Sequence, residues 1–343
     1  MPLSLSRRLL LAGPVLLAEA PRGAAAAGPA ARHIAVACWG GSYADVQRAV
    51  VDVRAGGLDI VVAQRITTEA ERVARLLSPQ AGGIDVALLS DVDAYRLSLR
   101  QLFAPVTTAG VAGLPTIAGG LRAPYGVPQG RTALTIAYNT TRVRVAPRGF
   151  RELFAVAKQG RVGFSSQLAI HNLAAGAIAE QHDGPASLQA ARNIFSALRK
   201  AGRLRLFADN ETLGAALAEG EIDMAPMWRS RAHVWQSQGR PVHDQVPVEG
   251  AIPFTILACV PVASRQQAAA MSYLDLLLHA DVQRAMAERT GLLPTIVDAR
   301  LDPALAARIG FTAAQQARFR PLSLDAVARN GLELRHYWDH ELA

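Results

Sequence analysis

From residue 32 onward, short apolar runs alternate with longer stretches whose apolar residues recur at helical spacing. The runs HIAVAC, LDIVVA, IDVALLS and TALTIAYNT are typical of buried strands, and segments such as TTEAERVARLL are typical of amphipathic helices. This alternation predicts an α/β fold with a parallel sheet. The 343 residues are enough for two domains.

Two extended passages, around 131–138 and 250–257, enclose a block that itself alternates strands and helices. A chain that passes twice between two α/β lobes needs this arrangement. Ligands of α/β proteins bind beyond the carboxyl ends of the strands. We therefore expect two lobes, two crossovers between them, and a ligand in between.

The stretch CWGGSYADVQRA follows the first predicted strand. Ser42 stands three residues before Asp45, as in a capping box, and Val46, Ala49, Val50 and Val53 follow at helical spacing. The stretch predicts a strand, a tight loop and a helix N-terminus, whose N–H groups can bind a ligand. An ordinary βα turn is the alternative.

The first 30 residues have the three parts of an export signal. Arg7 and Arg8 precede an apolar stretch, and an alanine-rich tract follows it. The paired arginines favour the twin-arginine route. We expect the signal to be cleaved and the protein to be periplasmic. A disordered extension is the alternative.

Charge and motifs exclude several classes. The formal net charge is +8, but Lys158 and Lys200 are the only lysines, the arginines are scattered, and 6% of residues are aromatic, so we expect no nucleic-acid partner. Cys38 and Cys259 each lie in an apolar run, which favours separate buried thiols. No cofactor or nucleophile motif occurs, and HYWDH lacks a clear third metal ligand, so we predict no cofactor, metal site or catalytic residue.

Five segments occur in the order WGGSYADVQR, VPQGRTALTIAYNTTRV, GEIDMAPMWRSRA, PVEGAIPF and YLDLLLHADVQRAMAERTGLLPT. Together they resemble the periplasmic solute-binding proteins of ABC importers, in the branch that includes spermidine/putrescine-binding proteins. The passage AVVDVRAGGLDI is shorter than is usual there.

The resemblance implies a type II-like periplasmic binding protein fold, a small-molecule ligand, delivery to ABC permease subunits in the membrane, and no enzymatic activity. We expect a monomer. The expected lobes are residues 31–134 with 256–300, and 135–255 with 301–343.

Matching the segments one by one places a set of side chains between the lobes: Ser42, Tyr43, Ser90, Asp91, Tyr125, Arg131, Ser165, Ser166, Trp228, Arg231 and Glu249. Each has a structural alternative. The two aromatic rings could be core residues, the arginines surface residues, Glu249 an ion-pair partner of an arginine, and the serine pair helix caps.

The charge of these residues predicts the ligand class. Polyamine binders of this family use several carboxylates, some of them at the strand end that matches RVGFSSQ, where this chain has no acidic residue. Arg131 and Arg231 suit carboxylate or phosphonate oxygens, and Glu249 could hold an ammonium group. We therefore predict a small organic anion or zwitterion. The alternatives are a polyamine ligand and, in another class, an exported enzyme.

Overall fold

The computed structural model describes residues 32–78, 82–180 and 185–342. The predicted export signal lies outside these residues. None of the described helices is long and apolar enough to cross a membrane.

The main sheet has the strand order β2–β1–β3–β9–β4–β7, and β8 pairs with the far end of β4. Its strands are β1 (Arg32–Cys38), β2 (Ile60–Ile66), β3 (Val86–Ser90), β4 (Val127–Asn139), β7 (Met224–Trp228), β8 (Val242–Gln245) and β9 (Ile252–Cys259). β1 runs parallel to β2 and β3, whereas β9 is antiparallel to both β3 and β4. The sheet is therefore mixed, not purely parallel as predicted, because the strand that returns to the first lobe enters the sheet in the opposite direction.

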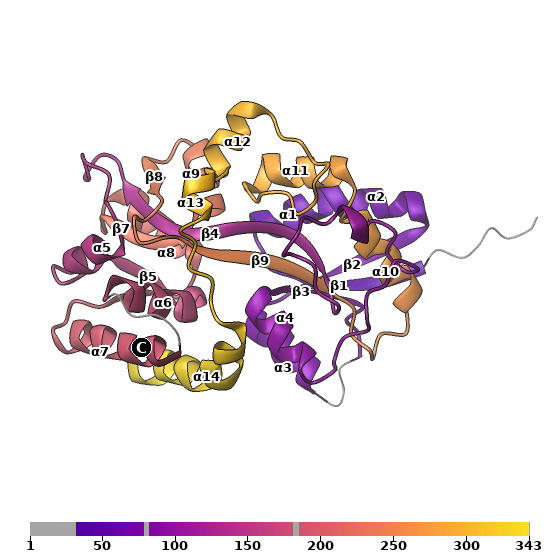
Figure 1. Ribbon diagram of the computed structural model, residues 1–343, viewed down its shortest axis with the longest axis horizontal. Coiled ribbons are helices and arrows are strands. Elements are labelled where there is room, and N and C mark those ends of the chain that lie inside the picture. Colours follow the sequence, from indigo (N-terminus) through magenta and orange to yellow (C-terminus); the bar gives the residue numbers. More distant parts are fainter. Residues whose placement is uncertain (1–31, 79–81, 181–184, 343) are drawn as a thin grey trace, which may run out of the picture. The chain divides into compact units, whose positions relative to one another are not determined.

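β4 and β9 run side by side through the middle of the described unit, between two groups of helices (Figure 1). Leu134 of β4 pairs with Ile252 of β9 on one side and with Trp228 of β7 on the other. The first half of β4 thus belongs to the sheet of β1–β3, and its second half belongs to the β7–β8 end. These two strands are the two predicted crossovers, and the chain has the two-lobe α/β fold.

A second, two-stranded parallel sheet is formed by β5 (Gly163–Ser165) and β6 (Arg205–Phe207). The α-helices are α1 (Ser42–Gln47), α2 (Val53–Ala55), α3 (Glu69–Leu77), α4 (Asp91–Ser98), α5 (Phe150–Ala157), α6 (Ala169–Ala179), α7 (Pro185–Lys200), α8 (Asn210–Glu219), α9 (Arg229–Ser237), α10 (Gln267–Leu276), α11 (Ala280–Thr290), α12 (Pro303–Ile309), α13 (Ala313–Gln316) and α14 (Leu324–His336). Short 3₁₀ turns occur at η2 (Gly56–Leu58), η3 (Leu114–Thr116) and η4 (Ser166–Leu168), and π-helical segments at η1 (Arg48–Asp52) and η5 (Tyr337–Leu342).

The helix ends follow local sequence signals in most places. The hydroxyl of Thr68 accepts the N–H of Glu71, and the Glu71 carboxylate accepts the N–H of Thr68, so the capping box of α3 forms. Gly291 ends α11 with a φ of 70°. At α1 the capping box predicted for Ser42 and Asp45 is wrong. Gly41 is the N-cap residue, and no side chain caps this helix.

The apolar spacing predicted after this loop is also only partly right. Val50 is buried, but Ala49 is exposed and Val53 is 70% exposed. The π-helical segment η1 adds residues to the turn and so rotates the following side chains, which brings Val51 and Ala55 into the core instead.

Two large apolar clusters form the cores of the two lobes. Most of one is built from residues between Leu134 and Ile252, and it is completed by Trp338 and other residues near the end of the chain. The other combines residues of Ile34–Val127 with residues of Phe254–Ala299. Cys38 and Cys259 are both buried and free, as predicted.

Candidate functional site

The loops that follow β1 and β3 lie at the carboxyl ends of neighbouring parallel strands, where α/β folds bind ligands. Ser42 is the first residue of α1 and directly follows the loop after β1. Ser90 ends β3 and caps α4, because its hydroxyl accepts the N–H of Asp93 at 3.2 Å. Ser90 is buried. Its role as a helix cap is therefore visible in the structure.

Ser42 meets a residue that is distant in the sequence. Nη1 of Arg231, in α9, donates to Oγ of Ser42 at 3.1 Å and lies 3.0 Å from Oε1 of Glu211. Burial lowers the pKa of Arg231, and the charge of Glu211 raises it. The structure thus brings together two predicted site residues, one beside each core cluster.

Tyr43 lies behind this contact, at the end of a buried chain of hydrogen bonds. Its hydroxyl donates to Oε1 of Gln129 at 2.5 Å, and Gln129 donates to Gln47 at 2.6 Å. Gln47 donates to the Tyr273 hydroxyl, which in turn donates to Asp52. Burial raises the pKa of Tyr43 well above its usual value, so the hydroxyl keeps its proton. The network fixes the position of α1.

Asp91 and Arg131 are each linked to Thr255 of the crossover strand β9. Oδ2 of Asp91 accepts the N–H of Thr255 at 3.1 Å, and Oδ1 accepts the N–H of Val92. Arg131 lies directly opposite Thr255 in the antiparallel pair of β4 and β9. Side chains opposite each other in such a pair lie on the same face of the sheet. Burial raises the pKa of Asp91 to about 7, although the two N–H groups oppose this shift.

Arg131 is half-buried, and its Nε donates to the carbonyl oxygen of Pro294 at 3.3 Å. Among the residues that the structure describes, no carboxylate forms an ion pair with Arg131. Burial lowers its pKa, since a guanidinium removed from water loses hydration. The group is a partly desolvated cation, and within the described residues only its Nε has a hydrogen-bond partner.

Three rings pack where β7 and β9 meet α6. Trp228 stacks on Phe254 with centroids 4.4 Å apart, and His171 meets Trp228 edge-on at 4.7 Å. Nε2 of His171 is buried and has no hydrogen-bond partner in the described residues. Burial lowers the pKa of His171 to about 4, so the ring is neutral at pH 7. The sequence did not single out Phe254 or His171. Phe254 is one residue of a strand and His171 one residue of a helix, and no motif in the sequence marks either of them. Only their contact in three dimensions shows that they belong together.

The remaining predicted residues are more scattered. Tyr125 packs against a small core cluster, and burial raises its pKa to about 12, with the charge of Asp91 contributing. Ser165 is fully buried, and its hydroxyl has no partner among the described residues. Ser166 accepts a hydrogen bond from the indole N–H of Trp338 at 3.3 Å.

Glu249 has a structural contact that the sequence did not predict. Its two carboxylate oxygens accept the backbone N–H groups of Phe150 and Arg151, each at 3.1 Å, at the first turn of α5. A carboxylate here stabilises the free N–H groups and the positive end of the helix dipole. The alternative weighed for Glu249, an ion pair with an arginine side chain, is absent from the described residues.

Sequence reasoning also missed Arg72, in the first turn of α3. Its side chain is fully buried, and its guanidinium lies over the ring of Trp39, 4.3 Å from the centroid. Only Nη1 has partners, the carbonyl and hydroxyl oxygens of Thr67. Nε and Nη2 have none in the part of the chain described. Its burial could have been predicted from its position in the helix. Arg72 stands beside Val73 and one turn before Leu76, on the apolar side of α3.

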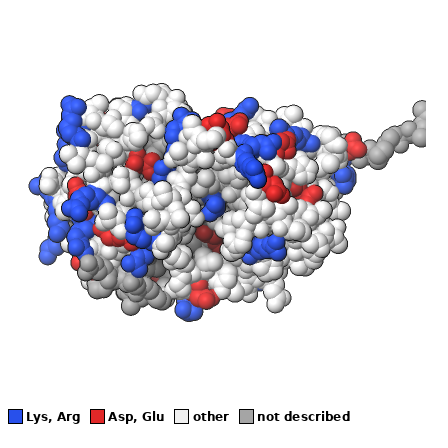
Figure 2. Space-filling view, turned by 45° about the horizontal axis from the view of Figure 1, so that its top comes forward, with Lys and Arg blue, Asp and Glu red and all other residues white. Residues whose placement is uncertain are grey.

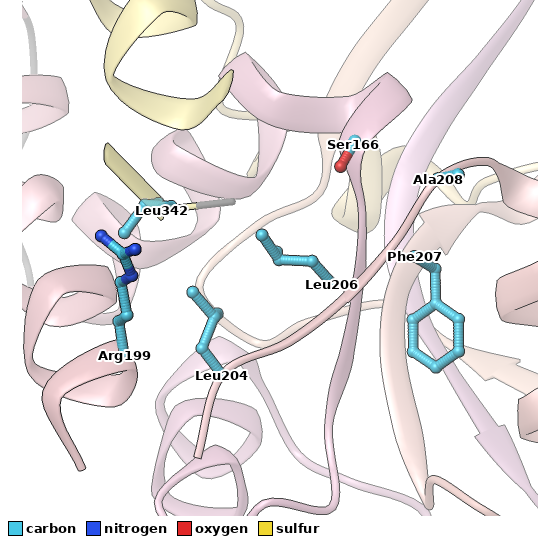
Figure 3. Close-up of a pocket in the computed structure, with 7 residues that line it drawn as sticks. All are labelled: Ser166, Arg199, Leu204, Leu206, Phe207, Ala208 and Leu342. Carbon is cyan, nitrogen blue, oxygen red and sulfur yellow. The ribbon is translucent and has the colours of Figure 1, made fainter. Parts of the chain in front are cut away.

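A pocket of about 260 Å³ lies elsewhere, beside β6. Figure 3 shows Leu204, Leu206 and Leu342 lying between Arg199 and Ser166. Of the predicted site residues, only Ser166 lines it. On the face drawn in Figure 2, basic side chains are interspersed with acidic ones, and side chains of both signs lie in a hollow near its middle.

No group of three or more His, Cys, Asp or Glu side chains in the described residues could hold a metal ion. At HYWDH the rings of His336 and His340 lie 4.6 Å apart, but Asp339 accepts a hydrogen bond from Arg335.

Comparisons with known proteins agree with this fold. A sequence profile of the family described as bacterial extracellular solute-binding protein matches residues 54–313. A search of curated protein sequences finds no significant match. The structure is similar to that of the Atu4243 GABA receptor, with a TM-score of 0.80 and 19% identity over 91% of this chain and 98% of that one.

Two further solved structures are also similar. One is the binding protein MotA of A. tumefaciens B6 in complex with glucopine, with a TM-score of 0.78 and 16% identity over 91% of this chain and all of that one. The other is a protein of Listeria monocytogenes assigned to spermidine/putrescine ABC transport. Its TM-score is 0.75, with 14% identity over 90% of this chain and 99% of that one. At these identities the likeness shows a common fold.

Proposed function

Since the chain belongs to the bacterial extracellular solute-binding proteins, which bind small molecules and deliver them to ABC permeases, we propose that its own ligand is a small organic anion or zwitterion. We further propose that residues 31–134 with 256–300 and residues 135–255 with 301–343 form the lobes around it. Ten of the eleven side chains predicted from the sequence are the proposed lining. Glu249 is left out, because both of its carboxylate oxygens accept backbone N–H groups at the start of α5. Export through the twin-arginine route, with cleavage of the first 30 residues, is part of the same proposal.

The observation that carries the ligand class is the guanidinium of Arg131, which forms no ion pair within the described residues. Removing a cation partly from water destabilises the folded state unless an anion forms an ion pair with it. Among the described residues no carboxylate does so, and a carboxylate of the ligand would form charge-assisted hydrogen bonds with it.

The acidic side chains also favour an anion or zwitterion over a polyamine. A polyamine needs free carboxylates, but both oxygens of Asp91 accept backbone N–H groups, and so do both oxygens of Glu249. With a pKa of about 7, Asp91 also carries only part of a negative charge at neutral pH. The similar structure named for GABA, which is a zwitterion, supports this ligand class, and the one assigned to spermidine/putrescine supports the alternative.

The test is a thermal-shift screen of the exported, ligand-free protein with 4-aminobutyrate, glutamate, succinate, phosphonoacetate, putrescine and spermidine. A ligand at about 100 times its Kd stabilises the folded state by about 2.7 kcal/mol, which raises Tm measurably. We expect one or more of the acids or zwitterions to raise Tm and neither polyamine to do so. Stabilisation by a polyamine alone would overturn the proposed class.

The same sample separates a binding protein from an exported enzyme. After incubation with the stabilising compound, the protein is unfolded and the compound is recovered and examined by NMR. We expect it to be recovered chemically unchanged. Conversion with turnover would favour the enzyme.

A further inference from the structure

Arg72 presents a pair of donors that have no hydrogen-bond partner among the described residues. A guanidinium can offer Nε–H and Nη2–H side by side along one edge, and this edge matches the two oxygens of a carboxylate. In Arg72 these are the two nitrogens that lack partners in the described residues, whereas Nη1 is bonded to Thr67. The free donors therefore form one complete binding edge.

The cost of leaving this edge empty is high. Arg72 is fully buried, and each charged donor that is removed from water without a partner destabilises the folded state by more than a neutral one does. Trp39 covers one face of the guanidinium at 4.3 Å, which stabilises the charge through the ring but satisfies no N–H group.

The nearest acidic side chain on the same helix does not fill the edge. Glu69 stands three residues earlier, and its Oε1 accepts the N–H of Ser90 at 2.6 Å. It makes no ion pair with Arg72 among the described contacts. Glu69 is therefore held toward the end of β3. Burial lowers the pKa of Arg72 and the charges of Glu69 and Asp93 oppose this shift, but neither carboxylate forms a hydrogen bond with the edge among the described residues.

Arg72 also lies at the edge of the sheet where α/β folds bind their ligands. It is in the first turn of α3, which begins directly after β2, and its partner ring Trp39 directly follows β1. The loop at Gly40 passes so close to β2 that an added Cβ would lie 2.8 Å from Cγ2 of Ile66. Trp39 and Arg72 are thus held together at the carboxyl ends of β1 and β2.

We infer that Arg72 is an anion subsite that binds a carboxylate of the ligand through Nε–H and Nη2–H, with Trp39 as its stacking platform. The inference rests on the proposed function, because it assigns one carboxylate-binding residue of the same site. It adds a residue that none of the five segments quoted in the sequence analysis contains.

The test uses the Nε–Hε signals of arginine in NMR spectra of the exported, ligand-free protein. Acetate is the probe, because it carries one carboxylate and is small enough to reach the edge whatever else the ligand needs. We expect the Arg72 signal to move in a saturable way with acetate and not with acetamide, its neutral analogue. A signal that does not move overturns the subsite.

The signal is assigned by its loss in Arg72→Lys, which keeps the charge and removes the fork. If that variant fails to fold, Trp39→Phe assigns it instead, since the stacked indole ring shifts the signal of Arg72. The matched control is Arg75→Lys, on the exposed side of the same helix.

Calorimetry with the acid that gives the largest thermal shift completes the test. We expect Arg72→Lys to weaken binding about tenfold or more and Arg75→Lys to leave it unchanged. A folded Arg72→Lys protein that binds with unchanged affinity overturns the subsite while the proposed function stands. Binding of polyamines alone overturns the proposed function, and the acetate titration then still decides whether Arg72 binds a carboxylate.

Discussion

Nη1 of Arg231 donates a hydrogen bond of 3.1 Å to Oγ of Ser42, although 189 positions separate the two residues in the chain. Arg231 belongs to α9, whose residue Trp235 is in one core cluster, and Ser42 belongs to α1, whose residue Tyr43 is in the other. The contact therefore joins elements of the two cores directly, beside the crossover strands.

This contact predicts a change in lobe closure. Ser42→Ala removes the acceptor, and a hydrogen bond of this kind contributes about 0.5–1.5 kcal/mol. We expect the ligand-free variant to have a larger radius of gyration in small-angle scattering than the ligand-free wild type, because open conformations gain population. Ser237→Ala, at the end of the same α9, is the control. Equal radii in Ser42→Ala and wild type would show that the contact does not hold the lobes.

Arg131→Ala should separate binding from stability. The guanidinium has no ion-pair partner among the described residues, so removing it leaves no opposite charge unpaired, and we expect Tm without ligand to stay the same or rise. Affinity for the acidic ligand should fall about tenfold or more, because charge-assisted hydrogen bonds of about 1.5–3 kcal/mol are lost. Calorimetry and thermal unfolding measure the two effects. A lower Tm with unchanged affinity would make Arg131 a structural residue.

Asp91 predicts a pH dependence of stability. Its pKa is raised to about 7 in the folded protein, against about 3.9 in an unfolded chain, so the folded state binds the proton more tightly. The stabilisation from this group is therefore full below the unfolded pKa and is lost as the pH rises through about 7. We expect Tm to fall between pH 5 and pH 8 by more in the wild type than in Asp91→Asn. Parallel Tm profiles of the two proteins would contradict the raised pKa.

His171 acts in the opposite direction and at lower pH. Burial lowers its pKa to about 4, so the unfolded chain binds the proton more tightly. The stabilisation from the neutral ring is full above about pH 6.5 and is lost as the pH falls through about 4. Its size is about 3 kcal/mol for a shift of this extent. Denaturant titrations of wild type and His171→Gln from pH 7 to pH 4 should show the wild type losing more free energy of unfolding.

Glu249 was predicted as a ligand residue, and the structure gives it a second role at the start of α5. Glu249→Ala leaves the N–H groups of Phe150 and Arg151 without their acceptor. We expect the free energy of unfolding to fall by about 1–2 kcal/mol and the affinity for the acidic ligand to stay within about twofold. Calorimetry and denaturant titration test both. A large loss of affinity without a loss of stability would show that Glu249 binds the ligand.

Much of the fold follows from periodicity in the sequence. The apolar runs at HIAVAC and IDVALLS became β1 and β3, and the capping signals at Thr68 and Gly291 set the ends of their helices. These features depend on neighbours along the chain. The capping box predicted at Ser42 failed because Gly41 is the N-cap residue of α1 and the serine hydroxyl accepts a hydrogen bond from Arg231, a contact that no local pattern encodes.

The candidate site was harder to predict for the same reason. Arg131 and Asp91 were singled out, but their link through Thr255 depends on strand register. Arg72 was not singled out, because an arginine in an amphipathic helix is normally exposed. Its burial depends on Trp39, which is distant in the sequence and packs over it. Sequence patterns identify strands, helices and loop ends well, whereas unsatisfied donors become visible only in three dimensions.

Trp338, which is fully buried, completes the core that otherwise comes mainly from residues between Leu134 and Ile252. The ribosome makes those residues first, and nearly ninety more residues separate Ile252 from this indole. During synthesis, the apolar surface that Trp338 later covers is therefore exposed. A chaperone can bind to such a surface. A nascent chain stalled before Trp338 should remain sensitive to protease within 134–252. Protection should appear only once Trp338 has left the exit tunnel.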